Sequence, residues 1–247
     1  MTPRVAVVIP ARLGSIRLTE KVLIPIEGRS MLEWVWRAAS DVPEADSVWI
    51  ATDSEKIAST VSDFGGQVLM TRKDHASGTD RVAEAAERID AEVIVNLQAD
   101  QPTMPAAVLS ALVRGFLADH VPMGTLVAPI TRAADRENPA RVKVVARQDG
   151  RALYFSRAPI PFDRDGTASD LGLLHLGVYI YRKEFLRIFT RLPVSRLESR
   201  EMLEQLRALE HGYEIGLVAV DYDGAGVDTP EDLNAVTARL RTLACSS

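Results

Sequence analysis

Cysteine is almost absent from this chain: Cys245 is the only one among 247 residues. A single cysteine cannot form an intrachain disulfide, which favours a reducing compartment and predicts a cytoplasmic protein. Histidine is scarce too, with four scattered copies. A structural zinc site needs clustered nitrogen and sulfur ligands, so none is expected.

Long hydrophobic runs are also missing. No apolar stretch approaches the roughly 20 residues of a membrane-spanning helix, and no basic-then-apolar signal segment begins the chain. The formal net charge is −5, whereas non-specific nucleic-acid binding relies on a broad positive surface. We therefore expect neither a membrane nor a nucleic-acid partner, although a local basic cluster can still bind a small anionic substrate.

Two familiar nucleotide-binding motifs are absent. The sequence has no G-x-x-x-x-G-K-[ST] phosphate loop, and no G-x-G-x-x-G follows its first predicted strand. These absences argue against P-loop hydrolases and ordinary Rossmann dehydrogenases.

The residues that are present have ordinary globular proportions, 47% hydrophobic and 26% charged, which allows a sizeable core. Apolar runs without alternation at 5–9, 48–51 and 93–98 predict buried strands, a further short strand is predicted at 67–70, and helical spacing follows several of them. This alternation predicts an α/β fold with a mainly parallel central sheet and helices on both faces.

The second half of the chain has a different pattern. Short strands are predicted at 125–130, 141–146, 152–155, 174–181 and 214–220, and one helix within 194–210. Thr229 and Pro230 begin a last helix, with an acid three residues after the cap. We predict a single domain over 1–247, with a nucleotide-binding half (1–120), a strand-rich half (about 121–225) and a C-terminal segment (226–247).

The loop after the first strand is rich in cations. Pro10 is expected to end strand pairing, because proline has no backbone donor. Arg12, Arg17 and Lys21 follow, together with the turn-permitting Gly14. A buried strand leading into a flexible basic loop suits a polyphosphate ligand. A solvated loop that carries arginines by chance is the alternative interpretation.

Two aspartates are candidate metal ligands. Asp100 lies just after a buried strand, where open α/β sheets bind ligands, and Asp228 lies in a glycine-containing turn. Two carboxylates near a basic loop can hold Mg²⁺ together with substrate phosphates. Alternatively, each aspartate is an ordinary turn or helix-start residue.

Polar residues of the second half could line a sugar pocket. His175 and Tyr179 share one face of a predicted strand, and a guanidinium such as Arg157 or Arg164 can grip a carboxylate with two parallel bonds. A half-exposed strand face and surface arginines explain the same pattern. The stripe of Glu201, Glu204 and Gln205 on the 194–210 helix is by default a solvated face.

Several ordered blocks resemble one family, the 3-deoxy-manno-octulosonate (Kdo) cytidylyltransferases, or CMP-Kdo synthetases of lipopolysaccharide biosynthesis. The blocks span nearly the whole chain. They are I-P-A-R-L-G-S-I-R-L (9–18), A-T-D (51–53), M-T-R-K-D-H-A-S-G-T-D-R (70–81), V-N-L-Q-A-D-Q-P (95–102), A-L-Y-F-S-R-A-P-I-P-F (152–162), H-L-G-V-Y-I-Y-R (175–182), E-M-L-E-Q-L-R-A-L (201–209) and G-V-D-T-P-E-D-L (226–233).

The resemblance implies a Rossmann-like nucleotidyltransferase fold, a strand-rich dimerisation region and a homodimer. It also implies transfer of CMP from CTP to the anomeric hydroxyl of Kdo, with release of pyrophosphate and a requirement for Mg²⁺. The implied catalytic residues are Arg12, Lys21, Asp100 and Asp228, of which the two aspartates bind the metal. The implied nucleotide contacts are Ala11, Arg12, Arg17, Lys21, Ser77, Gly78, Gln98 and Asp100. The implied sugar contacts are Gln98, Arg157, Arg164, His175, Tyr179, Glu204 and Gln205.

Several residues depart from the family pattern, among them Ser199 where many members carry histidine. Glu20 replaces the glycine of the usual L-P-G-K-P-L block, and Ala99 and Gln101 change Q-G-D-E-P to Q-A-D-Q-P. Gln101 is similar to the subgroup that uses 8-amino-Kdo, which leaves the sugar open. CMP activation of another nonulosonic acid, such as a sialic acid, is a second alternative. A nucleotide-binding regulatory protein with impaired turnover is a third, because Glu20 would repel a triphosphate and alanine disfavours positive φ.

Overall fold

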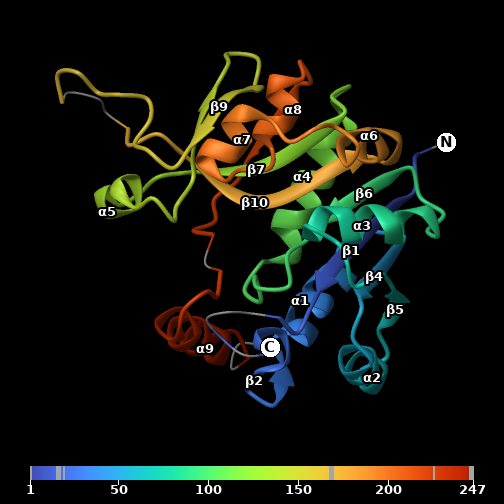
Figure 1. Cartoon of the computed structure of the whole chain (residues 1–247). Coiled ribbons are helices and arrows are strands. Elements are labelled where there is room, and N and C mark those ends of the chain that lie inside the picture. Colours follow the sequence, from blue (N-terminus) through green and yellow to red (C-terminus); the bar gives the residue numbers. More distant parts are fainter. Residues whose placement is uncertain (1, 15–17, 19, 167–169, 225, 245–247) are drawn as a thin grey trace. The chain divides into compact units, whose positions relative to one another are not determined.

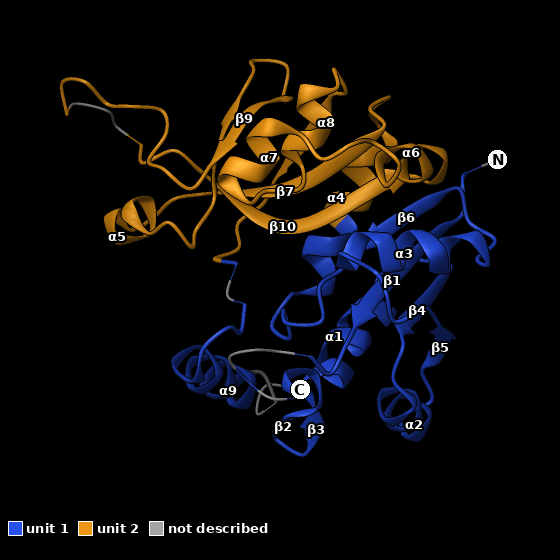
Figure 2. Cartoon of the chain, viewed as in Figure 1, with its two compact units in different colours: residues 1–110, 224–247 blue, residues 111–223 orange. Residues whose placement is uncertain are grey.

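The computed structural model describes residues 2–14, 18, 20–166, 170–224 and 226–244. The chain divides into two compact units, which Figure 2 shows in different colours. Unit 1 comprises Met1–Ser110 and Gly224–Ser247, and unit 2 comprises Ala111–Asp223. These borders lie close to the expected divisions near residues 120 and 225, while a single domain over 1–247 stays a prediction.

Unit 1 is built on parallel strands. The central strand β1 (Val5–Ala11) pairs in parallel with β4 (Ser47–Thr52) and β6 (Val93–Asn96), and β5 (Gln67–Met70) pairs in parallel with β4 (Figure 1). Residues 5–9 of β1 are almost fully buried, as expected for a strand covered on both faces. The predicted α/β class is therefore confirmed.

The expectation that Pro10 ends strand pairing is wrong. The register of β1 with β4 continues through Pro10 to Ala11, opposite Thr52. Pairing with β6 stops earlier, at Val8. Beyond Val8 the strand therefore pairs with β4 alone, and a residue without a backbone donor is tolerated where one edge of the strand is unpaired.

The helices of unit 1 begin at polar caps. The serine hydroxyls of Ser30, Ser54 and Ser77 accept backbone N–H groups at the starts of α1 (Met31–Ser40), α2 (Glu55–Asp63) and α3 (Gly78–Glu87). The connection from β5 to α3 is short, because α3 already begins at Gly78. Asp80 completes a capping box with Ser77 and so extends the helix toward its N-terminus.

The C-terminal segment belongs to unit 1. Its helix α9 (Pro230–Ala244) starts with reciprocal bonds between Thr229 and Asp232, which confirms the predicted cap. The apolar side chains of Val227, Val236 and Leu240 pack with Ile26 and Met31. Those two belong to the hairpin of β2 (Pro25–Ile26) and β3 (Arg29–Ser30) and to α1. Helix α4 (Ala106–Leu117) carries the chain into unit 2.

Unit 2 is rich in strands, as predicted. Strand β10 (Leu173–Arg182) is antiparallel to β7 (Met123–Pro129) and β8 (Lys143–Ala146). β9 (Ala152–Ser156) forms an antiparallel pair with β8, and β11 (Ile215–Ala219) is parallel to β7. The remaining helices of the unit are short: α5 (Ala133–Glu137), α6 (Lys183–Phe189), α7 (Arg196–Glu201) and α8 (Leu206–Glu210).

The single helix expected within 194–210 is wrong. The chain forms α7 and α8 instead, because Met202 takes a left-handed conformation (φ 53°) and ends α7. Glu201 therefore does not share a helical stripe with Glu204 and Gln205. Among the described helices, none combines the length and the apolar character needed to cross a membrane.

Candidate functional site

Three segments of unit 1 that are distant in the sequence meet at the ammonium group of Lys21. Its Nζ atom donates to Asp100 Oδ2 at 2.9 Å, to Asp228 Oδ1 at 3.2 Å and to the carbonyl oxygen of Val227 at 2.7 Å. The predicted meeting of the two aspartates with the basic loop is thus present in the structure. Their role as metal ligands stays a prediction.

Local packing explains this convergence. Lys21 begins the short 3-10 helix η1 (Lys21–Leu23), and Asp100 follows β6 in a turn. The backbone N–H of Val227 donates to the Asp100 carbonyl at 2.9 Å. The Val227 side chain is fully buried, so the backbone that carries Asp228 is held against the turn that carries Asp100.

The charges and oxygen atoms of this cluster suit a divalent cation. Two carboxylates face one ammonium, and both keep contact with solvent, with side-chain exposures of 33% for Asp100 and 57% for Asp228. Two carboxylate oxygens and one carbonyl oxygen already surround a single cationic nitrogen. Mg²⁺ takes such oxygen ligands and completes its shell with water and substrate phosphates. In the described part of the chain no three His, Cys, Asp or Glu side chains gather as a metal site, so phosphate or water oxygens would be needed.

The predicted nucleotide contacts of unit 1 lie at the end of β1 and the start of α3. A Cβ atom on Gly78 would lie 3.5 Å from Pro10 Cγ and 3.8 Å from Gln98 Oε1, so these three residues adjoin one another. The Gln98 side chain is oriented by a bond from its Nε2 to Asn96 Oδ1 at 2.8 Å. The Ser77 hydroxyl bonds within its capping box.

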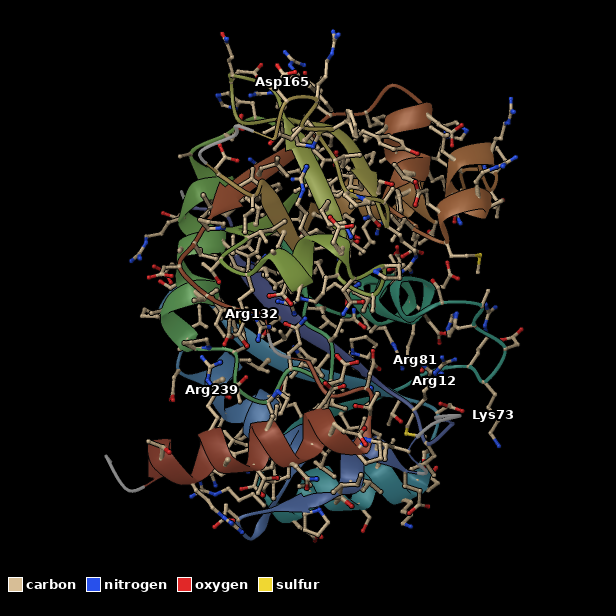
Figure 3. The ribbon with its side chains drawn as sticks, turned by 90° about the vertical axis from the view of Figure 1, so that its left-hand side faces the viewer. Arg12, Lys73, Arg81, Arg132, Asp165 and Arg239 are labelled. Carbon is tan, nitrogen blue, oxygen red and sulfur yellow. The ribbon has the colours of Figure 1, made fainter. Side chains whose placement is uncertain are left out.

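Ala11 and Arg12, the two residues that follow Pro10, differ in exposure. Ala11 is buried at the end of β1, whereas Arg12 is exposed. Figure 3 labels Arg12 on the same side of unit 1 as Arg81 and Lys73. Arg17 lies outside the described residues, so its predicted contact with the triphosphate stays a prediction.

Glu20 is paired with a neighbouring lysine. Its carboxylate forms an ion pair with Lys56 at 2.5 Å, which neutralises the charge. Its backbone is left-handed (φ 52°), a conformation that glycine adopts without strain. Ala99 is not among the described non-glycine residues with positive φ. The charge of Glu20 and the backbone of Ala99 therefore no longer argue for a protein with impaired turnover.

In unit 2, His175 lies within a row of aromatic rings. Its ring centroid is 5.1 Å from that of Phe155 and 5.3 Å from that of Tyr179. Burial lowers the pKa of His175 to about 3, so the imidazole is neutral at neutral pH. The Thr125 hydroxyl donates to the Val178 carbonyl at 2.6 Å, so it accepts from His175 Nε2 at 3.0 Å. This assigns the proton to Nε2 and leaves Nδ1 as an acceptor.

Tyr179 and Gln205 form a buried polar pair. The tyrosine hydroxyl donates to Gln205 Oε1 at 2.9 Å, and burial, with a smaller effect of the Glu204 charge, raises the pKa of Tyr179. Gln205 is 2% exposed, and its Nε2 atom has no hydrogen-bond partner in the structure. A buried donor without an acceptor is costly, which makes this amide a candidate donor for a ligand oxygen. Glu204, the neighbouring predicted sugar contact, is half-buried.

Arg157 is engaged with backbone rather than turned to solvent. Its guanidinium donates from Nε to the Glu201 carbonyl at 2.7 Å, from Nη1 to that of Pro139 at 3.0 Å and from Nη2 to that of Met202 at 3.3 Å. This arginine therefore fixes the turn between α7 and α8. Arg164 is exposed, and the structure gives it no place among the other predicted sugar contacts.

Two buried cations were not predicted from the sequence. Arg81 is 5% exposed and pairs with Asp53 at 2.9 Å at the carboxyl end of β4. Lys143 is fully buried, and its ammonium donates to the carbonyls of Asn138, Arg141 and Arg157 at 2.6 to 2.9 Å; burial lowers the pKa of Lys143. Each of these cations has a partner in a segment distant from it in the sequence, so no local pattern indicates either of them.

Two cavities lie away from these clusters. One of about 610 Å³ in unit 1 is lined mainly by α1, residues 102–106 and α9. One of about 250 Å³ in unit 2 is lined by residues that include Arg132, Asp135 and Arg141. Neither lining contains a residue predicted to bind nucleotide, sugar or metal.

Comparison with known proteins decides the family. A family model described as cytidylyltransferase matches residues 6–215. A 3-deoxy-manno-octulosonate cytidylyltransferase of Syntrophobacter fumaroxidans (strain DSM 10017 / MPOB) is 49% identical over 238 residues, which covers 94% of this chain and 95% of the relative. The chain belongs to the 3-deoxy-manno-octulosonate cytidylyltransferase family. A second member of this cytidylyltransferase family, from Syntrophotalea carbinolica (strain DSM 2380 / NBRC 103641 / GraBd1), is 47% identical over 248 residues, with 97% and 99% coverage.

Solved structures agree with this assignment. A CMP:2-keto-3-deoxy-manno-octonic acid synthetase complexed with CTP superposes with a TM-score of 0.93 at 40% identity, covering 97% of this chain and 99% of the other. A cytidylyltransferase from Leptospira borgpetersenii serovar Hardjo-bovis (strain JB197), with a TM-score of 0.63 and 16% identity, shares the fold. The predicted family, fold and enzyme class of this cytidylyltransferase are therefore confirmed.

Proposed function

We propose that the cluster of Lys21, Asp100 and Asp228 is the site at which this cytidylyltransferase transfers CMP from CTP to Kdo in the cytoplasm, with Mg²⁺ as its cofactor. The main support for this site is that two carboxylates from distant segments bind the same ammonium. The fold adds that Asp100 follows β6 and Lys21 follows β1, at the carboxyl ends of neighbouring parallel strands, where α/β sheets bind nucleotides.

The reaction needs positioning and charge neutralisation more than covalent help from the protein. The anomeric hydroxyl of Kdo forms a bond to the α-phosphorus of CTP, and the bond from that phosphorus to pyrophosphate breaks. Arg12 and Lys21 supply positive charge to the triphosphate. Asp100, Asp228 and the Val227 carbonyl would hold Mg²⁺, which supplies Lewis-acid stabilisation of the phosphate oxygens.

We assign recognition of the base to the adjoining Gly78 and Gln98, and recognition of the sugar acid to unit 2. The amide Nε2 of Gln205 supports the second assignment, because it is a buried donor that still lacks an acceptor. Neutral His175 offers Nδ1 as an acceptor for a sugar hydroxyl. The choice between Kdo and 8-amino-Kdo rests on Gln101, whose side chain is buried next to Asp100.

Pyrophosphate release tests the activity, the sugar and the site. The purified protein is mixed with CTP and Mg²⁺ and with Kdo, 8-amino-Kdo or a sialic acid in parallel. We expect release with one of the first two sugars. Release with the sialic acid alone would assign another substrate class, and CTP binding without release would identify a regulatory protein.

Asp100→Asn is the matching site variant. It should lower turnover by at least about a hundredfold while the circular dichroism spectrum and the melting temperature stay close to those of the unchanged protein. Asp63→Asn, at an exposed position at the end of α2, serves as the control and should keep full activity. An active Asp100→Asn protein would show that the metal assignment is wrong.

We also propose a homodimer that forms through unit 2. Large apolar side chains are exposed on this unit, among them Leu153 at 54%, Val194 at 64% and Met202 at 75%, and exposed apolar surface is typical of interfaces. Light scattering should give twice the mass of the chain, and Leu153→Arg should shift the protein toward monomer. A wild-type monomer at micromolar concentration would contradict this part of the proposal.

A further inference from the structure

The Lys21 ammonium fills the position that a metal ion would need. An ammonium has three N–H donors and no acceptor, and all three donors have partners here: Asp100, Asp228 and the Val227 carbonyl. The lysine side chain is only 14% exposed. Lys21 is therefore a well-satisfied cation at the centre of the oxygen cluster.

An ammonium and Mg²⁺ cannot occupy this position together. Mg²⁺ binds its oxygen ligands at about 2.0–2.1 Å, whereas Lys21 Nζ lies 2.7 to 3.2 Å from the same oxygens. Two cations that share one set of oxygens would also repel each other strongly. Metal binding therefore requires that the ammonium leaves.

A triphosphate gives the ammonium another place to bind. The lysine side chain is a flexible four-carbon chain with a compact charge, and phosphate oxygens are strong acceptors for it. Free Mg²⁺ offers the aspartates a new cation but leaves Lys21 without an anion. A complex of Mg²⁺ with a nucleotide supplies both, because its phosphates can bind the Lys21 ammonium.

We propose that Lys21 occupies the metal position in the protein without nucleotide, and that it moves to the triphosphate when the metal–nucleotide complex binds. Free metal is thereby disfavoured, and metal and CTP enter together. This inference rests on the proposed function, because it assumes that Asp100 and Asp228 are the metal ligands.

Mn²⁺ binding tests the inference without measuring activity. Binding is followed by electron paramagnetic resonance for the unchanged protein, Lys21→Met and Lys21→Gln, first without nucleotide. Removal of the ammonium should tighten Mn²⁺ binding by about tenfold or more, because two carboxylates lose their internal cation. The double variant Lys21→Met with Asp100→Asn is the matched control, and in it the gain should disappear.

Thermal unfolding of the unchanged protein gives a test that needs no variant. Mg²⁺ alone should leave its melting temperature unchanged, whereas Mg²⁺ with CTP should raise it. For Lys21→Met, Mg²⁺ alone should raise the melting temperature. A rise with Mg²⁺ alone in the unchanged protein, or equal Mn²⁺ affinity in all Lys21 variants, would overturn the inference.

Failure of the metal assignment in the proposed function has a different signature. In that case the unchanged protein would bind neither Mn²⁺ nor the Mn²⁺–CTP complex, and the Lys21 variants would not gain affinity. If the protein binds the Mn²⁺–CTP complex, and if free Mn²⁺ binds the unchanged protein and all Lys21 variants with equal affinity, the metal assignment stands and the role of Lys21 is rejected.

Discussion

Glu20 shows how a family position can change its side chain while its backbone stays the same. The related block has glycine here, and the backbone of Glu20 still has the positive φ that glycine favours. The carboxylate that could repel CTP is paired with Lys56 instead. The residue therefore stores a small backbone strain beside the predicted triphosphate site.

Glu20→Gly and Glu20→Gln separate strain from charge. Glycine should stabilise the protein by up to about 1 kcal/mol, because it relieves left-handed strain, and it should slightly lower the KM for CTP. Glutamine removes the charge but keeps the strain, so it should change the KM in the same direction without the gain in stability. Urea unfolding and initial rates measure the two effects. Equal stability of both variants would argue against strain at this residue.

His175 should make stability depend on pH. Its pKa is about 3 in the folded protein and about 6.5 when unfolded, so the unfolded state binds more protons between these values. The stabilisation is complete above about pH 6.5 and is lost as the pH falls toward 3, at up to roughly 1.4 kcal/mol per pH unit. Urea unfolding from pH 7 to 5 should therefore show a weaker pH dependence for His175→Gln, which keeps a donor for Thr125. The same slope in both proteins would contradict a buried neutral imidazole.

At the scale of elements, the turn between α7 and α8 is fixed from another strand. Arg157 follows β9, and its guanidinium holds the carbonyls of Glu201 and Met202. The Glu201 carboxylate in turn accepts from the Ser156 hydroxyl at 2.6 Å and the Arg157 backbone N–H at 2.9 Å. This network also positions Gln205, the residue just before α8.

Arg157→Ala should therefore act through the turn. We expect a loss of about 2 kcal/mol in the free energy of unfolding, because three carbonyls lose a donor. The KM for Kdo should rise more than the KM for CTP. Arg157→Lys should recover part of the Kdo affinity, since one ammonium can reach some of the same carbonyls. Arg200→Ala, at an exposed position of α7, is the control, and equal effects on both substrates would speak against a role on the sugar side.

Elements fixed by local patterns could be predicted from the sequence, and elements fixed by distant contacts could not. Residues 5–9 and 67–70 gave correct strands because their apolar pattern is local, and the Thr229 cap was recognised for the same reason. The end of α7 at Met202 has no signal in the sequence, because the turn after this helix is held by hydrogen bonds from the distant Arg157. Likewise, the blocks of the family predicted that Asp100 and Asp228 serve one site, but only the fold shows Lys21 between them.

At the scale of the whole molecule, unit 1 is discontinuous: residues 224–247 return to the N-terminal segment. The returning chain supplies Asp228 to the site and Val227, Val236 and Leu240 to the core beside Ile26 and Met31. Both the site and the stability of unit 1 therefore depend on Val227, Asp228 and helix α9.

Deletion of residues 224–247 should have two effects. Activity should be lost, because Asp228 is removed. The protein should also bind the dye ANS and aggregate, because buried apolar side chains of α1 and the β2–β3 hairpin become exposed. Val227→Ala is the milder variant and should cost about 1–3 kcal/mol through the cavity it creates. A truncated protein that stays monodisperse and melts at the same temperature would contradict this prediction.

The arrangement of unit 1 has a consequence for the order of events during translation. The ribosome makes residues 1–110 first and must complete unit 2 before Val227 and α9 emerge. The apolar surface around Ile26 and Met31 therefore stays exposed until Val227 and α9 have been made. A nascent chain can close its nucleotide-binding unit only after residues 226–244 have emerged, which makes the interval before that the time when a chaperone is most needed.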